Sequence, residues 1–202
     1  MSSTNRYSRL LNLLKSSGFS GVAINPGPTL TYLTGLSFHL MERPVVLLIT
    51  TDEIPVLILP ELETSRLDRA AIPLRAFSYS DNPETWVEAF QAALKTLKLN
   101  KPKIAVEANR FRFLELNFLK TADPEIELSA GDDIFSQLRL LKDDDEIALM
   151  HRAVAAAQQA LEYTMPLIKP GVSEKDIAAE LTIQLLRAGS EPELPFPPIV
   201  SG

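Results

Sequence analysis

Several residue types are absent or rare, and each absence narrows what this chain can do. The 202 residues include no cysteine, which excludes disulfides, thiolate metal sites and cysteine nucleophiles and fits a reducing cytoplasm. No apolar run approaches the roughly 18 residues that span a membrane. The polar start, Met1-Ser-Ser-Thr-Asn-Arg6, lacks the apolar core of a signal peptide. We therefore expect a cytoplasmic protein that does not enter a membrane.

Positive charge is also scarce. The 20 Lys and Arg are scattered and are outnumbered by 26 Asp and Glu, which gives a net charge of −6. A nucleic-acid-binding protein needs a basic face for phosphates, so that class is excluded. The hydrophobic fraction of 46% is ordinary for a globular protein and is large enough to build a core.

What is present, over residues 1–141, is an alternation of helical and strand patterns, which favours an α/β domain whose sheet is covered by helices. The apolar runs 44–50 and 54–59 predict two buried strands joined by a hairpin turn at 51–53. Other strands are expected at 21–24, 74–79, 103–107 and 125–128, and helices at 7–18, 61–71, 82–97, 110–120 and 132–140, with a short helical turn ending at Gly35.

Residues 142–202 have a different character. Four acids, Asp143-Asp-Asp-Glu146, stand where a helix would begin and where they would complement its dipole. A second helix is predicted after the cap Ser173, with a buried stripe of Ile177, Leu181 and Leu185. Residues 193–202 read as a strand. Two helices and one strand cannot enclose a core, so this segment needs a partner: further chain, the first domain or another subunit.

Few residues could carry chemistry. His39 lies in an expected loop, where a solvated or structural role is favoured over substrate contact, and His151 sits one step off the apolar stripe of its helix. The acids 143–146 point in different directions along a helix start and do not have calcium-loop spacing. Tyr32 and Trp86 could line a pocket, although Trp86 lies on an apolar stripe typical of core packing. The residues alone indicate a noncatalytic α/β domain with a helical extension.

Two distant stretches resemble one family. The segment Asn25-Pro-Gly-Pro-Thr-Leu-Thr-Tyr-Leu-Thr-Gly35 is similar to the N-P-x-N-x-x-Y-L-T-G segment of creatinase/prolidase-type Xaa-Pro peptidases of family M24. The segment 138–153 resembles their junction helix, R-x-x-K-x-x-x-E-I-x-x-M-x-x-A. Residues 169–174 and 196–202 resemble the next landmarks in the same order, so the resemblance covers nearly the whole chain.

The resemblance implies a noncatalytic N-terminal α/β domain with a mixed sheet over residues 1–141. It also implies the first helices of a pita-bread catalytic domain over 142–202. In this family the catalytic domain holds two divalent metal ions, with Mn²⁺ expected, and the substrates are peptides with proline after the scissile bond. Both the metal ligands and the catalytic histidines fall beyond the Ile199-Val-Ser-Gly202 landmark, so no catalytic or metal residue is assigned here.

The resemblance further implies that the N-terminal domain mediates dimerisation and helps to wall an active site, with Tyr32 and His39 as candidate rim residues. The expected function is therefore the inactive N-terminal portion of an Xaa-Pro aminopeptidase or dipeptidase, partnered by the remainder of its pita-bread domain. A metal-free binding or assembly module is the alternative, and a free-standing small-molecule-binding α/β domain is a third possibility.

Overall fold

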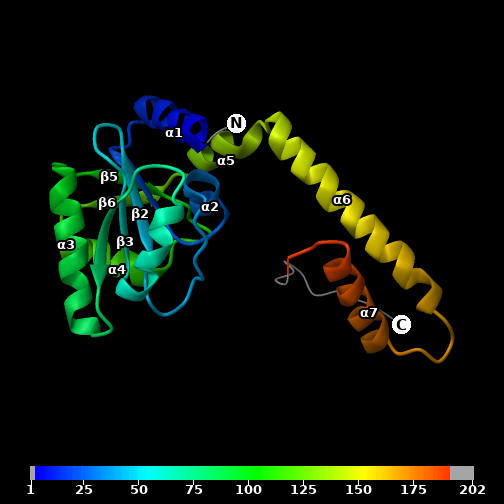
Figure 1. Cartoon of the computed structure of the whole chain (residues 1–202). Coiled ribbons are helices and arrows are strands. Elements are labelled where there is room, and N and C mark those ends of the chain that lie inside the picture. Colours follow the sequence, from blue (N-terminus) through cyan, green and yellow to red (C-terminus); the bar gives the residue numbers. More distant parts are fainter. Residues whose placement is uncertain (1–2, 192–202) are drawn as a thin grey trace. The chain divides into compact units, whose positions relative to one another are not determined.

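The computed structural model describes residues 3–191, and they fall into two compact units, Met1–Leu141 and Lys142–Gly202 (Figure 1). The predicted strand at 193–202 lies outside the described residues.

The first unit is built on a mixed six-stranded sheet with the order β4-β3-β2-β1-β5-β6. Strands β1 and β2 and strands β2 and β3 pair antiparallel, whereas β3–β4, β1–β5 and β5–β6 pair parallel. The strands are β1 (Gly21–Ile24), β2 (Val46–Thr50), β3 (Val56–Pro60), β4 (Arg75–Tyr79), β5 (Lys103–Val106) and β6 (Glu127–Ala130). The predicted α/β fold and the hairpin of two buried strands are confirmed.

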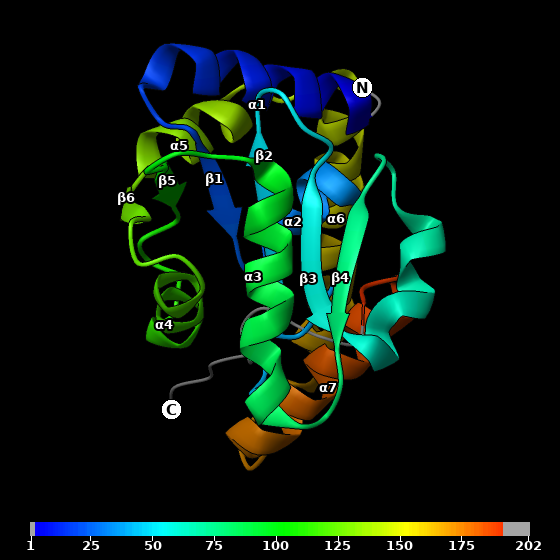
Figure 2. The ribbon, with the colours of Figure 1, turned by 90° about the vertical axis from the view of Figure 1, so that its left-hand side faces the viewer.

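Side chains alternate between the two faces of the sheet, and each face packs into its own core. In β2, Leu47 and Ile49 join one cluster, whereas Val46 and Leu48 join the other. Helices α1 (Ser3–Ser17), α2 (Pro28–Thr34) and α5 (Asp132–Leu140) contribute to the first cluster. Helices α3 (Trp86–Leu97) and α4 (Phe113–Ala122) contribute to the second, and Figure 2 shows α3 lying over that face. The result is a three-layer arrangement with the sheet in the middle.

Local signals explain where several helices begin and end. Gly35 ends α2 with a φ of 72°, a conformation that a residue without a Cβ adopts at no steric cost. The Asn82 side chain accepts a hydrogen bond from the Glu84 N–H, which starts the short 3₁₀ turn η2 (Pro83–Thr85) ahead of α3. Trp86 is buried against the core, as its place on the apolar stripe predicted.

Some predicted elements differ from the structure in type or in bounds. The segment predicted as a helix at 61–71 is a 3₁₀ helix, η1 (Glu61–Arg69), with no buried residue, so no apolar stripe anchors a regular α-helix. Helix α4 begins three residues later than predicted because the Arg110 and Phe111 N–H groups both close a turn on the Glu107 carbonyl. Strand β6 begins at Glu127, the residue that pairs with Lys103 of β5.

The second unit contains α6 (Asp144–Thr164), the 3₁₀ turn η3 (Met165–Leu167) and α7 (Glu174–Arg187). Asp143 and Glu146 form a capping box: each carboxylate accepts a 2.9 Å hydrogen bond from the other residue's N–H. This confirms that the acidic run starts a helix. At α7 the Ser173 hydroxyl accepts from the Asp176 N–H, as predicted for its cap. Among the helices of residues 3–191, none combines the length and apolarity needed to cross a bilayer.

The apolar stripes of the second unit are less buried than the sequence predicted. Ile177, Leu181 and Leu185 are half-buried, and α7 has no fully buried residue, which corrects the expected buried stripe. In α6 the large apolar side chains are more than two-fifths exposed, whereas Ala160 and Thr164 are buried. Two helices in contact can cover only one side of each other, so the remaining apolar surface meets solvent.

Candidate functional site

The first candidate residue, Tyr32, lies in α2 and is half-buried. Its ring is covered by the guanidinium of Arg6 in α1, whose central carbon lies 4.3 Å from the ring centroid. Arg6 Nη1 also donates a 3.3 Å hydrogen bond to the Tyr32 carbonyl. The cation–π contact and the hydrogen bond together fix Tyr32 against α1. Tyr32 therefore presents a restrained aromatic side chain at the surface of α2.

The second candidate, His39, lies in the loop of residues 36–44 between α2 and β2, which we call the His39 loop. Buried and exposed side chains alternate over its first three residues: Leu36 and Phe38 are buried, and Ser37 between them is exposed. His39 and the three residues after it are exposed, and Met41 is 58% exposed. The Met41 N–H donates to the His39 carbonyl at 3.1 Å, which closes a tight turn. The loop thus has a buried stem and an exposed tip.

Side chains from distant elements hold the carbonyl groups of this loop. Arg66 of η1 donates from Nη1 to the Ser37 carbonyl at 2.7 Å and lies 5.7 Å from the Phe38 ring centroid. The Tyr79 hydroxyl of β4 donates to the Pro44 carbonyl at 2.6 Å. The loop is therefore fastened at both ends of its stem, which is unusual for a surface connection without secondary structure.

A third contact holds the exposed tip. Arg112, just before α4, donates from Nη1 to the Met41 carbonyl at 2.6 Å. Its Nε and Nη2 donate to the carboxylate of Glu115, with Nε 3.0 Å from Oε1 and 3.1 Å from Oε2. Glu115 is fully buried, so Arg112 is its counter-ion inside the fold. The sequence analysis missed this pair; the Arg-x-x-Glu spacing was visible, but its burial was not.

Because Tyr79 is buried, the free energy of unfolding depends on pH in the alkaline range. Desolvation raises the pKa of Tyr79 well above the ordinary value of 10.0. Above pH 10 the unfolded chain releases this proton and the folded chain retains it, so stability falls as pH rises. We expect Tyr79→Phe to cost about 1 kcal/mol at neutral pH through the lost hydrogen bond to Pro44. Its urea midpoint should fall less steeply than that of the unmodified chain above pH 10.

The matched control for this titration is Tyr163→Phe, because Tyr163 is 62% exposed in α6. Urea midpoints are measured at pH 7, 9 and 10.5. Between these pH values the midpoint of the control should change by the same amount as that of the unmodified chain. Parallel curves for Tyr79→Phe as well would show that Tyr79 ionises equally in both states.

A second buried polar cluster joins the Asn25-Pro-Gly-Pro28 segment to the end of β5. The Thr29 hydroxyl donates to Glu107 Oε1 at 2.7 Å, and Arg139 Nη2 of α5 lies 3.5 Å from the same oxygen. Asn25 donates weakly to the Arg110 carbonyl at 3.5 Å. These contacts link α2, β5 and α5 where the parallel strands β1 and β5 end. They explain structurally why polar residues follow β1.

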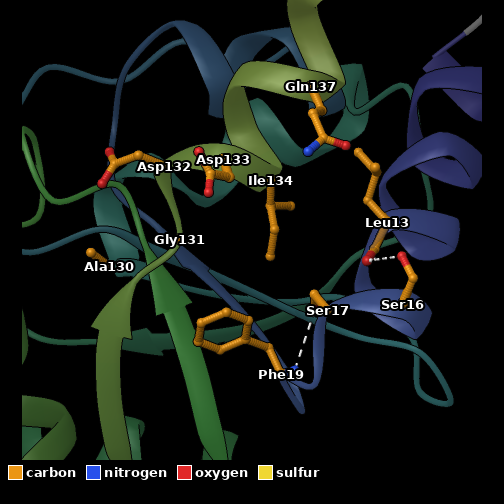
Figure 3. Close-up of a pocket in the computed structure, with 10 residues that line it drawn as sticks. All are labelled: Leu13, Ser16, Ser17, Phe19, Ala130, Gly131, Asp132, Asp133, Ile134 and Gln137. Atoms are coloured by element: carbon orange, nitrogen blue, oxygen red, sulfur yellow. Dashed lines mark hydrogen bonds between the residues drawn. The ribbon is translucent and has the colours of Figure 1, made fainter.

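A cavity of about 500 Å³ lies between the end of α1 and the start of α5 (Figure 3). Ser16 and Ser17 face it, but their hydroxyls donate to the carbonyls of Leu13 and Leu14 in their own helix. Asp132 and Asp133 stand in the first turn of α5, where they complement the helix dipole. These contacts give the residues structural roles, and no histidine is among the residues that line the cavity.

The described residues do not fit a resident metal ion. Within residues 3–191 there is no group of three or more His, Asp or Glu side chains close enough to hold one. His151 is exposed on α6 and belongs to no such group among the described residues.

Comparison with known families agrees with the fold. Residues 6–141 match the Creatinase/Prolidase N-terminal domain, and residues 148–202 match Metallopeptidase family M24. The first match covers more than half of the chain, so this protein belongs to the creatinase/prolidase N-terminal domain family. The resemblance drawn from the sequence motifs is confirmed.

Individual relatives share these features. The putative dipeptidase YkvY of Bacillus subtilis is 28% identical over 92% of this chain and 51% of its own length. The prolidase of Thermococcus sibiricus superposes with a TM-score of 0.87 at 22% identity, over 98% of this chain and 53% of that one. This chain spans about half the length of the curated relatives it matches.

A further solved structure matches part of this chain over nearly its own whole length. A proline dipeptidase chain from Streptococcus pneumoniae is 26% identical, with a TM-score of 0.58, and the match covers 67% of this chain but 98% of that one.

Proposed function

We propose that these residues act as the noncatalytic N-terminal portion of a longer, metal-dependent peptidase that cleaves dipeptides or other peptides before proline. The observation that carries this proposal is the order of the two family matches. An N-terminal domain of the creatinase/prolidase type is followed at once by the start of an M24 match, in relatives about twice as long. Proline-containing peptides are proposed as substrates because relatives carry the names prolidase and Xaa-Pro dipeptidase.

The exposed apolar surface of the second unit supports a partner. Large side chains on α6 stay solvent-accessible, and a groove of about 580 Å³ between α6 and α7 is lined largely by small apolar residues. The exposed α6 side chains are Ile147, Leu149, Met150, Val154, Leu161 and Tyr163. Burial stabilises by about 25 cal/mol per Å² of apolar surface, so a covering partner would be favoured. We propose that the remainder of a pita-bread domain covers it.

In this proposal the N-terminal domain walls an active site, and Tyr32 and His39 lie at its rim. Support comes from the exposed His39 tip and from the restrained Tyr32 ring. The two metal ions would be held by residues that follow this segment, where they would activate water for attack on the scissile carbonyl. Dimerisation through this domain and the identity of the metal as Mn²⁺ stay predictions.

The test compares two polypeptides: the chain of 202 residues, and the polypeptide obtained by extending it with whatever coding sequence follows codon 202. With Mn²⁺ and an Xaa-Pro dipeptide, we expect turnover from the extended polypeptide and none from the 202 residues. In the extended polypeptide, His39→Gln is expected to raise KM severalfold, whereas Glu84→Gln, at an exposed residue just before α3, serves as the control.

Chelator-sensitive hydrolysis by the 202 residues alone would contradict the proposal, because it would place the metal ligands in this segment. A stop codon directly after codon 202 would instead favour the metal-free binding or assembly module. An unchanged KM in His39→Gln would remove His39 from the rim while leaving the peptidase assignment intact.

A further inference from the structure

We infer that Arg112, held by the buried carboxylate of Glu115, is a positioning residue that fixes the exposed tip of the His39 loop. The inference rests on the proposed function in one respect, namely that this loop walls an active site. Its structural content is independent of that role. It concerns which residues decide where the loop tip lies.

The geometry of the Arg112 guanidinium group supports this inference. A guanidinium group presents its donors in a rigid planar fork. Two nitrogens of Arg112, Nε and Nη2, are turned to Glu115, and this leaves Nη1 to donate to the Met41 carbonyl at 2.6 Å. Because Glu115 belongs to the first turn of α4 and is fully buried, the orientation of the fork is set by the core of the domain. The core thereby determines the position of a carbonyl in an exposed tip.

The small stability gained from a buried ion pair also supports this inference. A buried ion pair is a poor way to gain stability, because desolvation offsets much of the attraction and well-packed apolar residues often serve as well. What an apolar pair cannot do is donate to the loop. The arrangement at Arg112 is therefore better explained by specifying a conformation than by stabilising the fold.

A second arginine, Arg66, is also paired with an acid and also donates to a carbonyl of the His39 loop. Arg66 pairs with Glu63 at 2.5 Å, three residues earlier in the same 3₁₀ helix, and donates to the Ser37 carbonyl. Arg112 pairs with Glu115, three residues later, and donates to Met41. In both cases an ion pair at a spacing of three residues orients an arginine whose remaining donor holds a carbonyl of the His39 loop. The Glu63 pair is more exposed, so Arg112 is the firmer anchor.

The three held carbonyls lie at the start, tip and end of the loop. Ser37 and Pro44 are held near the two ends of the loop, and the Arg112 contact restrains the tip at Met41. Loops that carry binding residues are effective when a rigid framework positions them. Arg112 supplies that restraint at Met41, two residues from His39.

The test measures the loop in the 202-residue chain by hydrogen exchange and mass spectrometry. Arg112→Met alone would leave Glu115 buried without a partner and could unfold the domain. The informative variants are therefore Arg112→Met combined with Glu115→Met, which removes both charges, and Arg112→Lys, which keeps a charge but loses the fork. Arg75→Met, exposed on β4, is the matched control.

In both informative variants we expect deuterium uptake at residues 36–44 to accelerate on the order of tenfold, because each lost or weakened hydrogen bond favours local opening. Cleavage by a glutamate-specific protease after Glu42 should accelerate in parallel. The control should match the unmodified chain. If either informative variant folds and its loop keeps the original uptake, the inference is wrong.

A second readout separates this inference from the proposed function. In an extended, active polypeptide, Arg112→Lys is expected to raise KM for an Xaa-Pro dipeptide severalfold while changing kcat little, because the reacting groups lie elsewhere. A loosened loop with an unchanged KM would support Arg112 as the positioning residue and contradict the rim role of the loop. A loop that stays protected would overturn the inference whatever the kinetics.

Discussion

Gly131→Ala is expected to destabilise the first unit by about 3 kcal/mol, the upper part of the range for overpacking a core. Gly131 lies between β6 and α5, where its N–H donates to the Val106 carbonyl. A Cβ at this position would lie 2.4 Å from the Cβ of Ala105, a fully buried residue of β5. Its φ of −127° is ordinary for any residue, so the whole effect is a steric clash. Urea denaturation followed by circular dichroism measures it.

Two further variants isolate the clash. Combining Gly131→Ala with Ala105→Gly moves the methyl group from β5 to the residue between β6 and α5, and we expect this pair to recover most of the lost stability. Gly18→Ala places a methyl group in open space at a φ of 75°, so only backbone strain of about 1 kcal/mol is expected. Equal losses in Gly131→Ala and Gly18→Ala, without recovery in the pair, would mean that contact with Ala105 is not the cause.

Phe90→Ala is expected to cost about 4 kcal/mol, as is typical when a buried aromatic side chain is truncated. Phe90 is fully buried in α3, and its ring stacks on Phe118 of α4 with the centroids 5.1 Å apart. Removing it opens a cavity between the helical layer and the sheet. Because neighbouring rings on this face already contact one another, they cannot all shift to fill the space.

The control for this truncation is Phe113→Ala, which removes the same ring from a side chain that is 78% exposed at the start of α4. We expect its stability to change by no more than about 0.5 kcal/mol. Both variants should be compared by urea midpoint at neutral pH. A loss below about 1 kcal/mol for Phe90→Ala would show that this helical layer repacks freely.

The residue pattern predicted the elements well where a local signal defined them. The strand Gly21–Ile24 and the helix Asp132–Leu140 have the predicted bounds, and each is followed or preceded by a turn residue. The prediction failed where the signal was weak. The segment at 61–71 has apolar residues but no stripe wide enough to bury, and it forms a 3₁₀ helix.

The candidate site was predictable only in part. Tyr32 lies within the family motif of residues 25–35 and His39 follows it by four residues, so the resemblance suggests a rim role for both but says nothing about their neighbours. Arg66 and Arg112, which hold the His39 loop, carried no functional signal because arginines with acids three residues away are common on exposed helices. Arg6, which holds Tyr32, had no local signal either, since its contact is 26 residues away in the sequence.

By itself, the sequence determined the alternation of strands and helices, the acidic start of α6, the cap of α7 and the family to which the chain belongs, because caps, periodicity and motifs are local properties. Only the tertiary structure decided the mixed strand order and the complete burial of Glu115. It also decided that Arg112 reaches a carbonyl 71 residues away. Burial and long-range hydrogen bonds depend on how distant segments pack, and no spacing within a segment encodes that packing.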